Sequence, residues 1–217
     1  MKISYLFNSS IPSNLPSSLQ VAKMCEGMQK KLHDVNLITP MPGLNAKYLA
    51  KYYNIKNKFR LYKIKFFTKY PLGINYYLFS LVSIFYALRL KTDLFVTRNF
   101  FTCFLLVIFK KKTIFEIHHD ITTESRIVKF LFNNFKILNS KTIIKIVAIS
   151  KGVKKYLIND LGTLEEKIQI LPSASGLNFK NWKGKINSKK KKIKYWIFWK
   201  FRKNKRGKFF NKTFQKG

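Results

Sequence analysis

The chain has 217 residues, and 47% of them are apolar, so it can bury a core and is not an intrinsically disordered protein. Its two cysteines, Cys25 and Cys103, belong to no CxxC or Cys/His cluster, which excludes a disulfide scaffold and a structural zinc site. The 43 Lys and Arg residues outnumber the 9 Asp and Glu residues by 34, which predicts attraction to phosphate-bearing partners such as nucleic acid, anionic lipid or nucleotides.

Short β-branched and aromatic runs alternate with helical stretches along residues 2–171. The runs predict strands at Lys2–Phe7, Val35–Thr39, Arg60–Phe66, Asp93–Thr97, Thr113–His118, Thr142–Ile149 and Lys167–Leu171. The stretches between them predict helices at Ser18–Leu32, Lys47–Tyr53, Ile74–Leu90, Phe100–Phe109, Thr122–Leu138 and Lys151–Leu161. This order predicts parallel βαβ units, and therefore an α/β fold with a Rossmann-like parallel sheet and helices on both faces.

Hydroxyl side chains stand before three of these helices, where they can accept a hydrogen bond from a free backbone N–H group. We expect Ser17 or Ser18 to cap the first helix, Thr122 or Thr123 the fifth, and Ser150 the sixth. Gly162 is predicted to end the sixth helix.

The two most apolar stretches, residues 74–90 and 100–109, are shorter than the roughly 20 residues that a membrane span needs. We interpret both as buried helices. Residues 1–18 contain no apolar run long enough for a secretory signal. We therefore expect a cytoplasmic location, with peripheral association at the inner face of the membrane as an alternative.

Ligands of parallel sheets bind at the carboxyl ends of the strands. This rule selects four loops, namely residues 8–18, 97–100, 118–123 and 150–152. The candidate cleft residues in the last three loops are Arg98, Asp120, Ser150 and Lys151. An imidazole at a strand end can donate to a hydroxyl group or to a developing negative charge, although a lone His pair is more often structural. Asp120 and Glu116 provide too few ligands for a metal, and we predict none.

Three segments together resemble the N-terminal half of the family 4 glycosyltransferases, which have the GT-B fold. They are KISYLFNSSIPSNLPSS at the start, FEIHHD at 115–120, and IVAISKGVKKYLINDLGTLEEKIQILPSASGLNFK at 146–180. The resemblance implies that this lobe carries the acceptor, while a second lobe binds a nucleotide-sugar substrate and no further cofactor is needed. It implies that His118 or His119 faces the transferred sugar as a catalytic residue, and that Asn8, Ser9 and Ser10 lie against donor and acceptor.

The implied domains are a glycosyltransferase lobe at residues 1–177 and a basic tail at 178–217. Residues 181–217 hold 15 Lys or Arg residues and no acidic residue, which predicts a disordered or weakly ordered segment. The family's second lobe would be about as long as the first, so we expect a truncated enzyme that is inactive alone. The parent enzyme would transfer sugar to a glycan or lipid-linked hydroxyl acceptor in surface glycan synthesis.

A frameshift is one explanation of the tail. Tryptophan has a single codon, TGG, and a forward shift of one base turns it into a glycine codon. Trp196 and Trp199 would then become a Gly-x-x-Gly turn at the start of the missing second domain, with the slip in the lysine run at 189–192. Sequencing this locus tests the hypothesis.

Two other functions remain open for the tail. Its lysines and Trp182, Trp196 and Trp199 suit a nucleic-acid-binding protein, or a protein that binds an anionic membrane surface, with nucleic acid the weaker alternative. A solvated tail without function and a bias toward A/T-rich codons are the competing explanations of the same residues.

Overall fold

The computed structural model describes residues 1–40, 46–64 and 72–172, which lie within one compact unit. Their strands are β1 (Lys2–Leu6), β2 (Asp34–Pro40), β3 (Arg60–Ile64), β4 (Leu94–Thr97), β5 (Thr113–Ile117), β6 (Ile143–Ala148) and β7 (Ile168–Ile170). Their α-helices are α1 (Pro16–Lys30), α2 (Ala46–Tyr52), α3 (Leu72–Arg89), α4 (Phe100–Ile108), α5 (Arg126–Asn134) and α6 (Lys151–Asn159). The predicted α/β fold and the order of its elements are confirmed.

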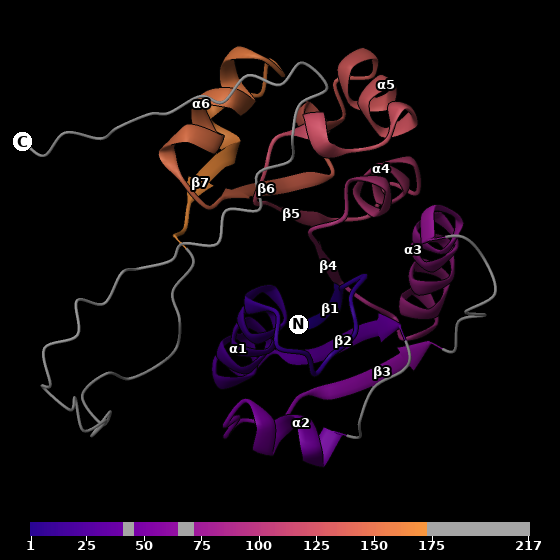
Figure 1. Ribbon diagram of the computed structural model, residues 1–217, viewed down its shortest axis with the longest axis vertical. Helices are drawn as coiled ribbons and strands as arrows, with labels where there is room; N and C mark the ends of the chain where they lie inside the picture. Colours follow the sequence, from indigo (N-terminus) through magenta and orange to yellow (C-terminus); the bar gives the residue numbers. More distant parts are fainter. Residues whose placement is uncertain (41–45, 65–71, 173–217) are drawn as a thin grey trace, which may run out of the picture. The chain divides into compact units, whose positions relative to one another are not determined.

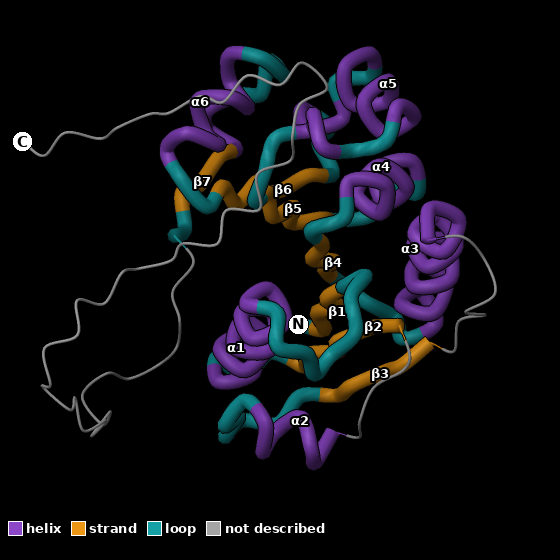
Figure 2. The backbone as a smooth tube through the Cα atoms, in the orientation of Figure 1, coloured by secondary structure: helices purple, strands orange, loops and turns teal. Residues whose placement is uncertain are grey.

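The strands form one parallel sheet with the order β3-β2-β1-β4-β5-β6-β7 (Figure 1). The chain builds outward from β1 in one direction, and then returns to the centre and builds in the other. Since parallel crossovers are right-handed, this reversal places α1 and α2 on one face and α3 to α6 on the other. Figure 2 shows the strands between these two helical layers.

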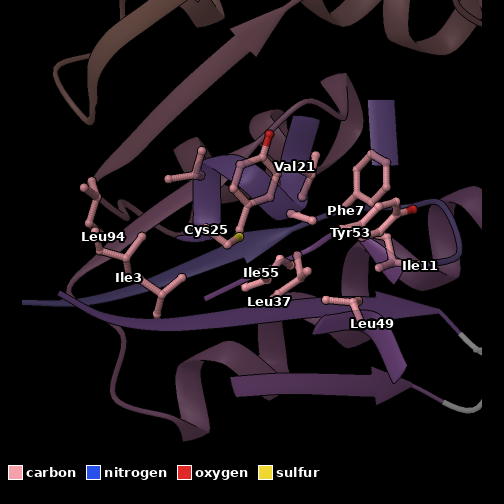
Figure 3. Close-up of a cluster of buried hydrophobic side chains, with 14 residues drawn as sticks. Ile3, Phe7, Ile11, Val21, Cys25, Leu37, Leu49, Tyr53, Ile55 and Leu94 are labelled. Carbon is pink, nitrogen blue, oxygen red and sulfur yellow. The ribbon is translucent and has the colours of Figure 1, made fainter. Parts of the chain in front are cut away.

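A continuous apolar core lies under α1 and α2 (Figure 3). Ile3 and Phe7 of β1 and Leu37 of β2 point to this face, where they pack against Val21 and Cys25 of α1. The alternate residues of the same strands, such as Leu6, pack against α3 and α4 on the opposite face. Both faces of β1 and β2 are therefore buried, and the covered residues include the polar side chains of Ser4, Asn36 and Thr39 as well as the apolar ones.

The two apolar stretches form α3 and α4, which pack against the sheet through Phe79, Ile84 and Leu106. None of the helices in the described part of the chain is long and apolar enough to cross a membrane.

The predicted helix at residues 122–138 is wrong in its length and in its cap. A short 3-10 helix at Ile121–Thr123 precedes α5, and another at Ile137–Asn139 follows it. The hydroxyl of Ser125, and not of a threonine, accepts from the amide of Val128 and fixes the start of α5. Lys136 has a positive φ of 44°, which ends the helical path after α5.

The predicted caps of the first and sixth helices had different outcomes. The predicted caps Ser17 and Ser18 both lie inside α1, which follows Leu15 and has no side-chain cap. Ser18 is buried and shares a hydrogen bond with Ser13. Ser150 caps α6 as predicted, with its hydroxyl 3.2 Å from the amide of Val153. Gly162 has a φ of 57° in the turn that follows α6, a conformation that favours glycine. The predicted basic tail at 178–217 and the end of the predicted strand at Phe66 lie outside the described residues.

Candidate functional site

The predicted site loops meet at one edge of the sheet. β1, β4, β5 and β6 are consecutive neighbours and run parallel, so the segments after their carboxyl ends lie along the same edge. These segments begin at Phe7, Arg98, His118 and Ile149. The structure therefore brings the N-terminal loop, Arg98, the histidine pair and Ser150 to the edge where open parallel sheets bind ligands.

Glu116 lies on β5 one residue before its end, and it is 1% exposed. Its neighbours Phe115 and Ile117 pack in the core beside α4 and α5. Because successive side chains of a strand point to opposite faces, Glu116 points to the other face, toward α1. The sequence had indicated this carboxylate only as an insufficient metal ligand, and the structure places it at the centre of a polar cluster.

Four side chains contact the carboxylate of Glu116. The Tyr5 hydroxyl donates to Oε2 at 2.8 Å. Arg98 Nη2 donates to Oε1 at 2.7 Å, and Gln20 Nε2 donates to the same atom at 3.3 Å. His118 Nε2 lies 2.6 Å from Oε1. We call these five residues the Glu116 network; it joins β1, α1 and the ends of β4 and β5.

Arg98 turns inward from the predicted cleft position. Its Nε donates to the hydroxyl of Tyr5 at 2.8 Å, and its Nη1 donates to the carbonyl of Ser17 at 3.4 Å. Only 10% of the side chain is exposed. The guanidinium is therefore occupied by protein groups, and it acts on the edge of the sheet by holding Tyr5 and Glu116 in place.

The charges in this network are balanced. Burial by itself raises the pKa of Glu116, but the hydrogen bond from His118 and the charge of Arg98 lower it more, so the pKa lies below its ordinary value. Glu116 is therefore ionised at neutral pH. Burial, followed by the charge of Glu116, raises the pKa of Tyr5 well above its ordinary value, which keeps the hydroxyl protonated as a donor.

His118 is held by one ring nitrogen. Its Nε2 faces Glu116, and 23% of the side chain is exposed. Among the described residues, none forms a hydrogen bond with its Nδ1. When a neutral ring donates its Nε2–H to a carboxylate, the lone pair lies on Nδ1. In that neutral tautomer, Nδ1 of His118 can accept a hydrogen bond from a hydroxyl group at the edge of the sheet.

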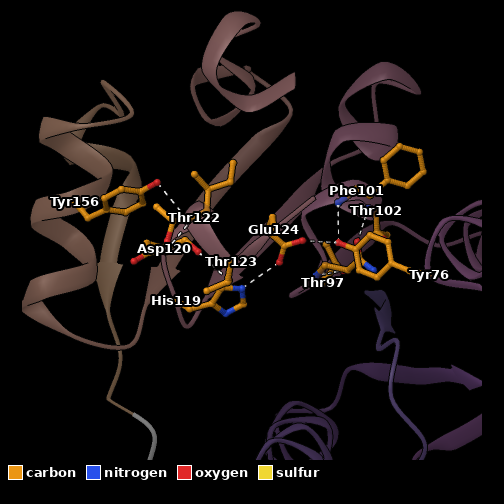
Figure 4. Close-up of polar contacts among 12 residues, drawn as sticks. Tyr76, Thr97, Phe101, Thr102, His119, Asp120, Thr122, Thr123, Glu124 and Tyr156 are labelled. Carbon is orange, nitrogen blue, oxygen red and sulfur yellow. Dashed lines mark hydrogen bonds and ion pairs between the residues drawn. The ribbon is translucent and has the colours of Figure 1, made fainter. Parts of the chain in front are cut away.

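His119 belongs to a second, more exposed cluster (Figure 4). Its Nε2 lies 3.1 Å from Oε1 of Glu124, and the hydroxyl of Tyr76 donates to Oε2 at 3.4 Å. The side chain of His119 is 47% exposed. Burial, followed by the charge of Glu124, raises the pKa of Tyr76, so its hydroxyl stays protonated. We call these three residues the Glu124 network.

Asp120 has a local structural role next to this network. Its carboxylate accepts from the amide of Thr122 at 2.9 Å and caps the short 3-10 helix (Figure 4). The hydroxyl of Tyr156 accepts from the amide of Ile121 at 3.2 Å and ties the same turn to α6. No group of three His, Cys, Asp or Glu residues with the arrangement of metal ligands occurs in residues 1–40, 46–64 and 72–172.

The N-terminal loop is anchored at its far end. The hydroxyl of Ser18 donates to the carbonyl of Ser10 at 3.4 Å, which ties the loop to α1. The side chains of Asn8, Ser9 and Ser10 are half-buried, and no described residue forms a hydrogen bond with them. The loop is therefore anchored through its backbone, while three of its polar side chains have no hydrogen-bond partner among the described residues.

Ser150 and Lys151 lie where β6 passes into α6. The hydroxyl of Ser150 is used by the helix cap, and Lys151 is exposed in the first turn of the helix. Lys151 is therefore the member of this pair whose side chain is directed by no described hydrogen bond.

Several solved structures are similar to this chain. UDP-GlcNAc 2-epimerase from Methanocaldococcus jannaschii has a TM-score of 0.56 and 17% sequence identity, over 78% of this chain and 45% of that one. Anabaena HepE in complex with UDP and glucose has a TM-score of 0.52 and 14% identity, over 80% and 45% of the two chains. A glycosyltransferase from Rickettsia africae has a TM-score of 0.48 and 17% identity, over 79% and 43% of the chains.

The fold is GT-B-like. This conclusion rests on the two similarities with TM-scores above one half. No family model matches the sequence, and a comparison with curated proteins finds no significant match. The chain spans less than half the length of these solved proteins, so their activities and substrates are not carried over to it by the fold.

Sequence reasoning missed Tyr5, Gln20 and the central role of Glu116. A signal for Glu116 was present, because it is the only charged residue in the apolar strand TIFEI. A charge there requires a buried partner if both faces of the strand are covered. The partners lie in other elements, and no local pattern identifies them.

Proposed function

We propose that this chain forms one wall of the substrate cleft of a nucleotide-sugar-dependent glycosyltransferase. The observation that carries the proposal is His118 at the end of β5, held through Nε2 by the ionised Glu116 with no described partner on Nδ1. A sugar hydroxyl at the carboxyl edge of the sheet can donate its proton to this nitrogen. The proposal is supported by the resemblance of the FEIHHD segment to family 4 enzymes and by the GT-B-like fold.

Different surrounding residues would contact different parts of the substrate. Asn8, Ser9 and Ser10 would hydrogen-bond the hydroxyls of donor and acceptor, since no described residue pairs with their side chains. Lys151, which is exposed at the start of α6, would contact a negative group of the substrate. His119 is the alternative catalytic histidine, and its greater exposure and longer contact with Glu124 make it the weaker candidate.

The parent reaction is transfer of a sugar from a nucleotide-sugar donor to a hydroxyl acceptor on a glycan or lipid-linked glycan. We propose that residues 1–177 are the acceptor-side lobe, and that the contacts to the donor phosphates come from a second lobe. Electrostatic stabilisation of the leaving group is commonly the largest contribution to catalysis, so the chain alone is expected to transfer no sugar. Sugar transfer by the purified chain would contradict this part of the proposal.

Histidine NMR tests the role of His118. The chain has only three histidines. His33 lies between α1 and β2, at the amino-terminal edge of the sheet and therefore at the edge opposite His118. We expect the ring signals of His118 to shift with UDP-glucose or UDP-GlcNAc and to shift much less with UDP alone. His118→Gln is expected to weaken sugar binding about tenfold, or about 1.4 kcal/mol. His33→Gln is the matched control and should bind normally.

The proposal fails if the His118 signals respond to no sugar, or if His33 responds equally. A nucleotide-sugar epimerase is the second candidate, because the UDP-GlcNAc 2-epimerase has the TM-score of 0.56. The two functions differ in the number of sugars bound. A transferase lobe also binds an acceptor sugar that carries no nucleotide, whereas an epimerase acts on one substrate. Shifts of His118 with UDP-GlcNAc only, and none with any free sugar, would favour the epimerase.

A further inference from the structure

The outer side of α5 exposes an apolar cluster. Ile127, Phe130 and Phe135 are 57%, 60% and 61% exposed, and the rings of the two phenylalanines lie 6.2 Å apart. The inner side of the helix buries Val128 and Phe132 against the core. Single exposed apolar residues are normal on protein surfaces, but a cluster of this kind marks a contact surface.

The charged residues of the same helix and its two ends are basic. Residues 125–137 contain Arg126, Lys129 and Lys136 and no Asp or Glu residue. Arg126 and Lys136 are exposed and Lys129 is half-buried, and none of the three forms an ion pair with a described residue. The preceding acid, Glu124, is turned toward His119. We call Arg126, Ile127, Lys129, Phe130, Phe135 and Lys136 the α5 surface.

This combination identifies the occupant. Aliphatic and phenylalanine side chains lose contact with water when they enter the boundary between lipid headgroups and acyl chains, and Lys and Arg are attracted to anionic headgroups. A second copy of this chain would bring two basic surfaces together, which like charges oppose. A nucleic acid would satisfy the charges and its bases could stack on the phenylalanines, but it would leave the aliphatic side chain of Ile127 without an apolar environment.

We propose that the α5 surface docks on an anionic lipid membrane. Ile127, Phe130 and Phe135 enter the headgroup–acyl boundary, and Arg126, Lys129 and Lys136 contact lipid phosphates. The proposal extends the membrane partner expected from the sequence, but it uses a defined surface of the folded domain and does not depend on the basic tail or on sugar transfer.

A fluorescent label at position 130 tests the contact directly. Cys25 and Cys103 are 0% exposed, so a cysteine introduced by Phe130→Cys can be labelled selectively with an environment-sensitive dye in the full chain. Leu32→Cys is the matched control, because Leu32 is 92% exposed and lies between α1 and β2, away from α5. We expect a blue shift at position 130 with vesicles of phosphatidylcholine and phosphatidylglycerol, none with phosphatidylcholine alone, and none at position 32.

Vesicle flotation measures how much the apolar side chains contribute to the affinity for anionic vesicles. The double variant Phe130→Ser/Phe135→Ser should bind the anionic vesicles about tenfold more weakly than the wild type, since two apolar side chains no longer leave water. Leu32→Ser should bind normally. His118→Gln should also bind normally, which separates this proposal from the role of His118. All variants carry residues 178–217, so any contribution of that segment is the same in each.

Four results would overturn the proposal. The labels at positions 130 and 32 could respond equally, or the double serine variant could float like the wild type, and either result would place the contact elsewhere. A shift at position 130 that grows with protein concentration without vesicles would identify a second copy as the occupant. Loss of oligonucleotide binding in the double variant, without loss of vesicle binding, would identify nucleic acid. Circular dichroism confirms that each variant is folded.

Discussion

The Glu116 and Glu124 networks lie at the same edge of the sheet, and each joins a glutamate to a histidine and a tyrosine. Glu116 is buried, contacts four side chains and faces a guanidinium at 2.7 Å. Glu124 contacts two side chains at 3.1 and 3.4 Å, and its histidine is 47% exposed. Similar groups should therefore contribute differently to the free energy of unfolding. Water replaces lost contacts at an exposed site and cannot do so at a buried one.

The largest expected difference concerns the two glutamates. Glu116→Ala leaves the Arg98 guanidinium buried without its counter-ion, so we expect the free energy of unfolding to fall by about 3–5 kcal/mol. Glu124→Ala should lower it by about 1 kcal/mol or less. Urea denaturation of both variants measures the comparison. Equal losses would show that the burial of Glu116 does not set its contribution.

A charge-free variant sharpens this result. Glu116→Leu combined with Arg98→Leu removes both buried charges, and apolar replacements of a buried ion pair are often tolerated. We expect the double variant to be more stable than Glu116→Ala. If it is less stable, the hydrogen bonds to Tyr5 and Ser17, and not the ion pair, hold this edge together.

The two tyrosines give the next largest difference. The Tyr5 hydroxyl donates to Glu116 and accepts from Arg98, so Tyr5→Phe leaves two charged groups each without one partner. We expect a loss of about 1–3 kcal/mol in the free energy of unfolding. Tyr76→Phe removes a 3.4 Å contact with Glu124 and should cost about 1 kcal/mol or less. Thermal denaturation of both variants ranks them, and a larger loss for Tyr76→Phe would reverse the comparison.

The pH dependence of stability reports the ionisation of Glu116. Its folded pKa is lower than its unfolded value of about 4.3, so its stabilising contribution is complete above that pH. The contribution is lost as the pH falls through the folded pKa. The difference in stability between the wild type and Glu116→Gln should therefore shrink below about pH 4.

Glu26 also contributes to the pH dependence of stability in acid. Burial tends to raise its pKa, but the hydrogen bond from Lys23 and the amides of Lys56 and Asn57 lower the pKa overall. Protonation of Glu26 therefore also lowers the free energy of unfolding in the same acidic range. Some pH dependence of stability should remain in Glu116→Gln. A difference between wild type and Glu116→Gln that is constant with pH would contradict the assigned ionisation of Glu116.

The smallest expected effect is that of His119. His119→Gln removes one contact of an exposed pair, so we expect a loss of about 0.5 kcal/mol or less in the free energy of unfolding. Urea denaturation checks this value against Glu124→Ala. A loss larger than that of Glu124→Ala would show that His119 contributes more through its ring, which lies 5.7 Å from that of Phe100, than through its contact with Glu124.

The order of strands and helices was predictable because it depends on local alternation and helical periodicity. Where two local signals competed, the prediction was wrong. Thr122, Thr123 and Ser125 are all capping residues, and the structure uses Ser125, which divides the expected long helix. The loops of the site were predictable from the rule for parallel sheets, and so were His118 and His119 within them.

The amino-acid sequence determined by itself that this chain forms a parallel α/β sheet and that His118 lies at its carboxyl edge, because strand and helix patterns are set by near neighbours. Only the tertiary structure decided which groups surround that histidine. Tyr5 and Arg98 are 111 and 18 residues from Glu116, and they meet it because β1, β4 and β5 are adjacent in the sheet. A buried charge must find its partner in space, and that partner is set by strand order and not by sequence distance.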